Sequence, residues 1–504
     1  MMRFLSGISA CVAWQWALLA CLCGTLVACS EAEPPSQSPQ VKAKPDPYTI
    51  RFVTINSPDT YFIDSQNNYA GLEYDLAKRF VTFLGPPYKL EVIVVDTFDK
   101  VFPTLLRGGA DIAAADISIT AARKRQVLFG PAFHQVQAMV VYNRDQNSAP
   151  TKAEALLDKR IVLPRSTSFV EKMRELQAQN PKLIWRETDK LSSEQLIEAV
   201  ARDEIDFTVA DNHLLAIMQY LYPQLDAGLM LGQSDNIAWA LNKLSGEHRL
   251  KQVQAFFKAI EKDGTLRNLL DRYYGHTKRL KQMDVATFLS KSRTLLPQYI
   301  RLFKGAQEVT DIDWRLLAAL SYQESHWDNY STSPTNVRGL MMLTEQTSNM
   351  MNVTNRLDPK QSIMAGAKFL LWMKDRIPAR IPEPDRTFMA LAAYNNGVGH
   401  LEDARIIAQR LGLNPDSWAD VKRGYQLLND PAHYVTVKHG YCSCGAPVIY
   451  TELVRSYYQI MQKYFPAYDP GLDPYKIADT KMPWLLARAP QATSMTGTTV
   501  AQLD

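Results

Sequence analysis

Residues 314–327 read Trp-Arg-Leu-Leu-Ala-Ala-Leu-Ser-Tyr-Gln-Glu-Ser-His-Trp, and this stretch decides how the C-terminal half of the chain is interpreted. Leu317, Leu320 and Glu324 recur at spacings of three and four, which predicts one face of a helix. A carboxylic acid on an apolar face is costly without a partner or a task, because burial raises its pKa. Such a Glu suits general acid catalysis near neutral pH, whereas a solvated Glu at the rim of the face is the alternative.

Length and composition indicate a globular protein of several units. The chain has 504 residues, which corresponds to roughly three units of about 150 residues each. Hydrophobic residues make up 46% and charged residues 21%, proportions that exclude a disordered chain. The net charge is only +4 and no long Lys/Arg run occurs, so nucleic acid is not an expected partner.

The N-terminus has the pattern of an export signal. Met1-Met2-Arg3 is followed by an apolar stretch over 8–28, which predicts a secretory signal. The segment Leu-Val-Ala-Cys at 26–29 resembles the bacterial lipobox, which implies cleavage before Cys29 and lipidation of that residue. With Ser30 next, the resemblance implies sorting to the inner face of a Gram-negative outer membrane, in the periplasm. An uncleaved membrane anchor is the alternative, since the run is long enough to span a bilayer.

Two flanking segments have compositions that do not build a core. Residues 30–47 are rich in Pro, Ser and Gln and are predicted to form a flexible tether. Residues 471–504 are predicted to be a partly disordered extension. Cys442 and Cys444 are too few for a zinc site, and a strained disulfide and two free thiols both stay open.

No metal or organic cofactor is expected from the sequence. The histidines considered show no ligand spacing, and surface or structural roles are predicted for them: His213, His326, His433 and His439.

Residues 48–276 are predicted to form an α/β domain. Strands are expected at 48–55, 90–95, 111–115, 160–163 and 206–210, with helices at 71–81, 101–107, 193–202 and 211–220 between them. This alternation predicts mostly parallel strands, and the two similar halves predict two lobes with a cleft between them.

Three stretches of this domain carry a family resemblance: Gly71-Leu-Glu-Tyr-Asp75, Leu106-Arg-Gly-Gly-Ala-Asp-Ile112 and Ile117-Ser-Ile-Thr-Ala-Ala-Arg-Lys-Arg-Gln-Val-Leu-Phe-Gly-Pro131. The domain resembles the amino-acid-type periplasmic solute-binding proteins. The resemblance implies an amino acid or a small peptide as ligand. A regulatory role for the domain is a hypothesis from the architecture, in which this domain precedes a second folded unit.

The same resemblance implies the ligand-binding residues. Ser118, Thr120 and Arg123 would hold the α-carboxylate of the ligand, for which the fork of an Arg is well suited. Asp211 of the second lobe would bind the ammonium group. The alternative is a fold that has lost its ligand, with Arg123 as a surface cation.

Residues 277–470 are predicted to be all-α. The expected helices are 299–309, 314–325, 344–351, 362–376, 387–395, 398–410, 417–428 and 449–463. Four blocks carry a second resemblance: Gln323–Trp327, Ser333–Met341, Ala390–Asn395 and Tyr450. The domain resembles the lysozyme-like catalytic domain of the soluble-type lytic transglycosylases.

This resemblance implies cleavage of peptidoglycan between N-acetylmuramic acid and N-acetylglucosamine. Glu324 would protonate the glycosidic oxygen, and the C6 hydroxyl of the same sugar would attack the anomeric carbon, leaving a 1,6-anhydro end. A hydrolase normally pairs two carboxylates. The motif offers only Asp328 nearby, and its side of the helix is predicted to be partly solvated.

The resemblance also implies supporting residues around Glu324. Ser333 would hydrogen-bond the acid or the substrate, and Tyr450 would hydrogen-bond the acid or shape its pocket. Tyr394 and Asn395 would line the cleft near the reacting sugar. For the two tyrosines, simple packing in the core is the alternative. The chain departs from the family in having Asn336 where Gly is frequent, at a turn expected to need positive φ. Met342 stands where the family usually has a Gln, and it is counted among the substrate-binding residues although it lacks the hydrogen-bond donor of that Gln.

Two other functions stay open at this point. One is a tethered sensor that binds peptidoglycan or a solute without catalysis, and the other is a hydrolase of the lysozyme type.

Overall fold

The structure is a computed structural model, and it describes residues 46–63, 68–244, 246–275, 282–333, 336–442 and 445–469. The predicted signal sequence with Cys29, most of the tether, and the C-terminal extension fall outside these ranges, and so does Cys444. Within the described residues, none of the helices combines the length and the apolar character that crossing a bilayer requires.

The first lobe of the α/β domain is built on a five-stranded sheet in the order β4-β1-β5-β14-β6. Its strands are β1 (Thr49–Ile55), β4 (Lys89–Val95), β5 (Ile112–Ala113), β6 (Val127–Phe129) and β14 (Ala240–Asn242). Its helices are α1 (Leu72–Leu84), α2 (Val101–Leu106), α3 (Ala121–Lys124), α7 (Glu247–Lys262) and α8 (Thr265–Tyr274), and a small ribbon joins β2 (Phe62–Ile63) to β3 (Tyr69–Ala70). Trp239 lies at the centre of an aromatic core with Phe52, Phe80 and Phe256.

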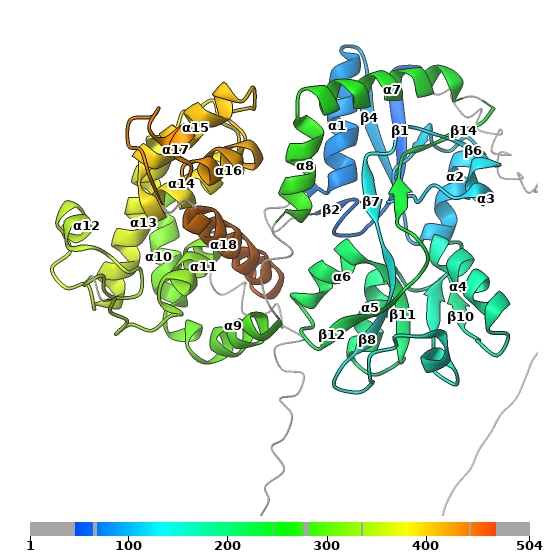
Figure 1. The fold of residues 1–504 in the computed structure, drawn as a ribbon, viewed down its shortest axis with the longest axis horizontal. Coiled ribbons are helices and arrows are strands. Elements are labelled where there is room, and N and C mark those ends of the chain that lie inside the picture. Colours follow the sequence, from blue (N-terminus) through cyan, green and yellow to red (C-terminus); the bar gives the residue numbers. More distant parts are fainter. Residues whose placement is uncertain are drawn as a thin grey trace, which may run out of the picture. The chain divides into compact units, whose positions relative to one another are not determined.

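The second lobe has β8 (Ala138–Asn143) between β11 (Phe207–Asp211) and β12 (Leu225–Met230), with β9 (Val162–Pro164) beside β10 (Arg186–Thr188). Its helices are α4 (Ser168–Gln179), α5 (Ser193–Ala201) and α6 (Asn212–Gln219). The chain passes between the lobes along β7 (His134–Val136) and β13 (Asp235–Ile237), which pair with each other (Figure 1).

The expectation of an α/β fold with two lobes is confirmed, but the expectation of mostly parallel strands is wrong. β1 pairs with β4 and β5 in parallel, and β9 pairs with β10 in the same way. The remaining pairs are antiparallel. In the first sheet, the antiparallel pairs arise because the chain leaves the sheet after β6 and re-enters it as β14 in the opposite direction.

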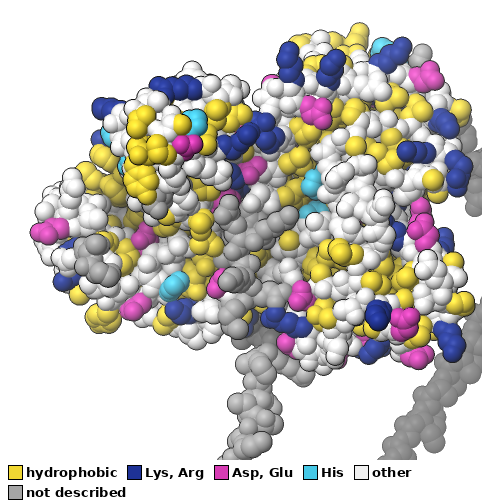
Figure 2. All heavy atoms as spheres, viewed as in Figure 1, with side chains coloured by type: hydrophobic (Ala, Val, Ile, Leu, Met, Phe, Trp, Pro, Cys, Tyr) yellow, Lys and Arg dark blue, Asp and Glu magenta, His cyan; other side chains and the backbone are white. Residues whose placement is uncertain are grey.

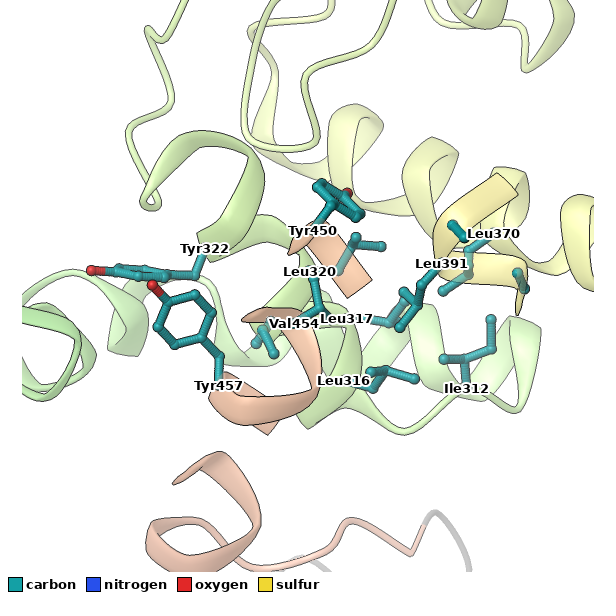
Figure 3. Close-up of a cluster of buried hydrophobic side chains, with 14 of the residues drawn as sticks. Ile312, Leu316, Leu317, Leu320, Tyr322, Leu370, Leu391, Tyr450, Val454 and Tyr457 are labelled. Carbon is teal, nitrogen blue, oxygen red and sulfur yellow. The ribbon is translucent and has the colours of Figure 1, made fainter. Parts of the chain in front are cut away.

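The C-terminal part is helical, as expected. Its helices are α9 (Gln282–Thr294), α10 (Ile300–Thr310), α11 (Trp314–Ser325), α12 (Glu345–Met350), α13 (Pro359–Asp375), α14 (Asp385–Asn396), α15 (Val398–Arg410), α16 (Trp418–Leu427), α17 (Pro431–Tyr434) and α18 (Gly445–Tyr464). Helix α11 is central, and almost every residue along it is buried. Its Leu317 and Leu320 lie among Tyr450 and Val454 of α18 and Leu391 of α14 (Figure 3).

Charged side chains of both signs are interspersed over the face drawn in Figure 2, and no large patch of one sign stands out there. This mixture agrees with the small net charge of the sequence.

Candidate active site and ligand cleft

Glu324 lies in the last turn of α11, where the helix leaves the core. The hydroxyl of Tyr450, a buried residue of α18, donates a hydrogen bond to Oε1 of Glu324. Immediately beyond the helix, His326 and Trp327 both adopt positive φ, and Nε1 of Trp327 donates to the carbonyl of Ala318 at 2.9 Å. This sharp turn ends α11 one residue after Glu324 and sets the direction of the chain that follows the helix.

The surroundings of Glu324 favour its protonated form. Burial raises the pKa of Glu324 to about 7, and the hydrogen bond from Tyr450 opposes part of that rise. Burial, together with the nearby Glu324 carboxylate, keeps the pKa values of Tyr394 and Tyr450 well above their usual range. Both tyrosines therefore stay protonated and can act as hydrogen-bond donors near neutral pH.

A single carboxylate dominates this site. Across the described ranges, burial and the Tyr450 hydroxyl account for the shift in the pKa of Glu324, and no second carboxylate contributes to it. Asp328 is exposed, beyond the turn that ends α11, which agrees with the solvated position expected from the sequence.

The loop 337–343 is held against α11 by side-chain hydrogen bonds. The hydroxyls of Ser321 and Ser325 donate to the carbonyl of Leu340 at 3.0 and 2.9 Å. The Tyr394 hydroxyl donates to the carbonyl of Met341 at 3.1 Å, and the Met341 N–H donates to the Ser362 hydroxyl at 3.2 Å. These bonds connect the loop to α11, α13 and α14, so the loop and Glu324 share one support.

Positive φ angles occur within this loop and at Asn336, the residue that precedes it. Gly339 has φ +81, and a Cβ there would lie 2.0 Å from the carbonyl oxygen of Arg356. Asn336 has φ 63, which confirms the turn that the sequence predicted at this position. Met342 has φ 41, and its side chain is half-buried. A loop with this many left-handed residues has a conformation that only Gly and Asn tolerate easily.

Other predicted support residues occupy different places. The Ser333 hydroxyl accepts a hydrogen bond from the Val337 N–H at 3.1 Å and so shapes the loop. Asn395 is exposed near the end of α14. The roles assigned to Ser333, Asn395 and Met342 toward substrate therefore stay predictions, while Tyr394 and Tyr450 have contacts that join them to the acid or its loop.

A second candidate site is the cavity between the two lobes of the α/β domain. Ser118, Arg123 and Asp211 line it, whereas Thr120 does not and instead caps α3 by accepting from the Arg123 N–H at 3.2 Å. Arg123 is only 5% exposed, and its guanidinium donates to the carbonyls of Ser118 at 2.9 Å and Ser166 at 3.1 Å. The idea that Arg123 is a surface cation is therefore wrong.

Burial shifts the pKa values of Arg123 and Asp211, two ionisable residues that line the cavity. Burial lowers the pKa of Arg123 to about 10, which leaves it charged at neutral pH. Burial and the nearby Asp116 raise the pKa of Asp211 to about 8. Asp211 Oδ1 is buried without a hydrogen-bond partner among the described residues, so a cationic group of a ligand would find an acceptor there.

Comparisons with known proteins agree with both halves of the structure. Residues 50–276 match the family described as bacterial extracellular solute-binding proteins, family 3, and residues 301–413 match the transglycosylase SLT domain. Membrane-bound lytic murein transglycosylase F of Methylobacillus flagellatus is 48% identical over 90% of this chain and 95% of its own length. This chain belongs to the membrane-bound lytic murein transglycosylase F family.

Other members of the family are similar over comparable lengths. The transglycosylase F of Nitrosospira multiformis is 44% identical, covering 89% of this chain and 92% of its own. Among solved structures, an ancestral arginine-binding protein bound to arginine covers 45% of this chain and 98% of its own length, at 21% identity and a TM-score of 0.41. As a member of the transglycosylase F family, the chain is a peptidoglycan lytic transglycosylase fused to a solute-binding domain.

The sequence interpretation of this transglycosylase F chain missed several residues of the cleft. Asp59 and Asp116 line the cavity and form a cluster with the buried His213, and Ser57 donates to Asp59. They lie on three separate segments, so no local spacing marks them. The one available signal was the position of Asp116 directly after a predicted strand, at the edge where ligands bind in α/β folds.

Proposed function

We propose that Glu324 is the only acid–base group of this lytic transglycosylase and that it generates 1,6-anhydro-muramoyl ends. The observation that carries the proposal is the half-buried Glu324 with a pKa of about 7, which accepts a hydrogen bond from Tyr450 and has no carboxylate partner in the described residues. A general acid needs a pKa near the working pH, and burial provides it here.

In the proposed reaction, the Glu324 carboxyl gives its proton to the oxygen that links N-acetylmuramic acid to N-acetylglucosamine. The bond from this oxygen to the anomeric carbon breaks, and N-acetylglucosamine leaves with a free hydroxyl. The C6 hydroxyl of the muramic acid then bonds to the anomeric carbon and returns its proton to Glu324. No water is consumed, and the acid is regenerated.

Neighbouring groups would support both halves of this cycle. The Tyr450 hydroxyl stabilises the Glu324 carboxylate that exists after proton transfer, because it donates to Oε1. Tyr394 holds the Met341 carbonyl and so the loop next to the acid. Ser333, which precedes the loop 337–343, Met342 within that loop and Asn395 at the end of α14 are proposed to contact the glycan.

Digestion of purified peptidoglycan, followed by mass spectrometry, tests the proposal. We expect muropeptides one water lighter than hydrolysis products. Glu324→Gln should keep the fold and glycan binding but lower kcat by about 10² to 10⁴, the usual contribution of a general acid. Asp328→Asn is the matched control and should retain activity, since Asp328 is exposed. Products of hydrolytic mass would instead indicate a lysozyme-type enzyme, and binding without any product would indicate a sensor.

We also propose that the α/β domain binds an amino acid or small peptide that regulates cleavage. Arg123 and Ser118 would take the α-carboxylate and Asp211 the ammonium group, since all three line one cavity. Thr120 would act by capping the short helix that carries Arg123. Calorimetric titration with an amino acid panel should give binding that Arg123→Ala abolishes. If no member of the panel binds, the domain has kept the fold without the ligand.

A further part of the proposal concerns where the protein is attached in the cell. The family is membrane-bound by name, and we propose that lipidated Cys29 anchors the chain to the inner face of the outer membrane, in the periplasm. We further propose domain limits of 48–276 and 277–470. A Cys29→Ala variant should move from the membrane fraction to the soluble periplasm; a variant that stays in the membrane fraction would favour an uncleaved anchor.

A further inference from the structure

The cluster of Asp59, Asp116 and His213 joins residues from both lobes beside the cleft. Nε2 of His213, on α6 of the second lobe, lies 2.8 Å from Asp59 Oδ2 and 3.3 Å from Asp116 Oδ2, both on the first lobe. One ligand atom from each residue lies within 4.8 Å of the others. The His213 and Asp59 side chains are each 4% exposed and that of Asp116 is 19% exposed. Three metal-binding side chains therefore converge on one buried point.

An ion pair alone leaves this arrangement incompletely satisfied. The single Nε2–H of His213 can be directed at only one of the two carboxylates. It bonds Asp59 at 2.8 Å, which leaves the facing Asp116 oxygen at a longer distance. Asp211 lines the same cavity, and its Oδ1 is buried without a partner among the described residues. Around this point the structure gathers one imidazole and the carboxyl groups of Asp59 and Asp116, with Asp211 lining the cleft beside them, a set of side chains that can ligate an additional cation.

Contacts from residues outside the cluster also hold the three side chains in place. Ser57 donates to Asp59 Oδ1 and leaves Oδ2 directed at His213. Asp116 has φ 52, a costly conformation for a residue other than Gly, and its N–H donates to Glu73 Oε1 at 3.1 Å. Tyr274 packs edge-on against the His213 ring at 5.0 Å between ring centroids. Outer contacts of this kind orient the ligands of metal sites.

We propose that Asp59, Asp116 and His213 form a binding site for a divalent transition metal of the zinc class, which bridges the two lobes. Zinc takes His nitrogen and Asp oxygen at about 2.0 Å, and tetrahedral geometry then separates neighbouring ligand atoms by about 3.3 Å. The observed separations of 2.8 and 3.3 Å from Nε2 require little rearrangement. Water or a carboxylate of a bound solute would fill the fourth position.

The ligand set also selects between metals. Magnesium and calcium prefer six or more oxygen ligands, whereas this site offers one nitrogen and two carboxylates. Because two ligands come from the first lobe and one from the second, the metal holds the lobes together. The sequence prediction of a structural role for His213 is replaced by this proposal, since ligands far apart in sequence have no spacing to recognise.

Calorimetric titration of the metal-free full-length protein in detergent, with zinc and with magnesium, tests the site. We expect one zinc per chain and no comparable binding of magnesium. His213→Ala and the more conservative Asp116→Asn should each weaken zinc binding at least 10-fold. His248→Ala, which removes an exposed histidine of α7, is the matched control and should leave zinc affinity unchanged.

Circular dichroism of each variant shows whether a loss of zinc reflects unfolding, and a folded Asp116→Asn protein keeps the test decisive. The proposal is overturned if the wild-type protein binds zinc no more tightly than folded Asp116→Asn, because the cluster is then an ion pair between the lobes. It is also overturned if magnesium competes equally. Zinc binding that survives Arg123→Ala would show that the metal site is independent of the proposed amino acid site.

Discussion

At the scale of single residues, the Glu324–Tyr450 pair sets the chemistry. Glu324 must be protonated to begin the reaction and ionised to complete it. Burial favours the first form, and the Tyr450 hydroxyl favours the second, so the two effects oppose each other. The resulting pKa near 7 allows both proton transfers close to neutral pH.

The pH dependence of cleavage follows from this balance. The protonated fraction of Glu324 decreases as pH rises through its pKa of about 7. We therefore expect kcat/KM to be flat below that pH and to decrease above it. Tyr450→Phe removes a bond to the carboxylate, which raises the pKa of Glu324 further. The descending limb should therefore move upward by about one to two pH units, given the usual strength of a hydrogen bond to a charged group.

Turnover of soluble glycan fragments across pH 5 to about 9 would locate the descending limb in the wild-type protein and in Tyr450→Phe. The wild-type protein is the reference, and Tyr441→Phe, which alters an exposed tyrosine outside the α11–α18 contact, is the control. A limb that stays in place or moves to lower pH in Tyr450→Phe would contradict the assigned role of Tyr450.

At the scale of elements, the loop 337–343 depends on its backbone. Gly339→Ala would place a Cβ 2.0 Å from the Arg356 carbonyl oxygen in a positive-φ conformation. We expect the loop to shift, with a loss of roughly 1–3 kcal/mol in the free energy of unfolding and a lower kcat, because Met341 and Tyr394 move with it.

Gly305→Ala is the control for that change. Gly305 lies inside α10, and nothing lies within 4 Å of its added Cβ. Alanine in a helix interior should be neutral or stabilise by up to about 1 kcal/mol. Thermal unfolding and a glycan-cleavage assay on both variants separate the effects, and equal behaviour of the two would refute a special role for the loop.

Elements with a strong apolar period were predictable from sequence. The helix 314–325 was expected with the bounds that α11 has, because a buried core face and the acid recur at helical spacing. The helix α9 was not expected, since its apolar residues are few and spread around it. The Glu324–Tyr450 pairing came from the family resemblance, whereas the cluster of Asp59, Asp116 and His213 arises only when three distant segments fold together.

At the scale of the whole molecule, a ligand in the cleft contacts both lobes and should stabilise the α/β domain. A ligand at 100 times its Kd adds about 2.7 kcal/mol to the free energy of unfolding, which raises the Tm of that domain. Arg123→Ala should abolish the increase, while Arg125→Ala, which alters an exposed neighbour, should retain it. Scanning calorimetry would measure both, and an increase that survives Arg123→Ala would place the ligand elsewhere.

Control of glycan cleavage by a ligand of the α/β domain would also involve the whole molecule. If lobe closure controls cleavage, a saturating amino acid that binds the cleft must change the rate of glycan turnover. An unchanged rate, with binding confirmed by calorimetry, would separate the two domains functionally and refute the regulatory proposal.

The position of Glu324 in the last turn of α11 has a further consequence. Aligned peptide dipoles give the C-terminal end of a helix a partial negative charge of roughly half an electron, which disfavours an anion there. The backbone of α11 thus adds to the preference of Glu324 for its neutral form, independently of the side chains around it. A helix extended by one turn would carry this field away from the carboxyl, so the length of α11 is itself a means of tuning the acid.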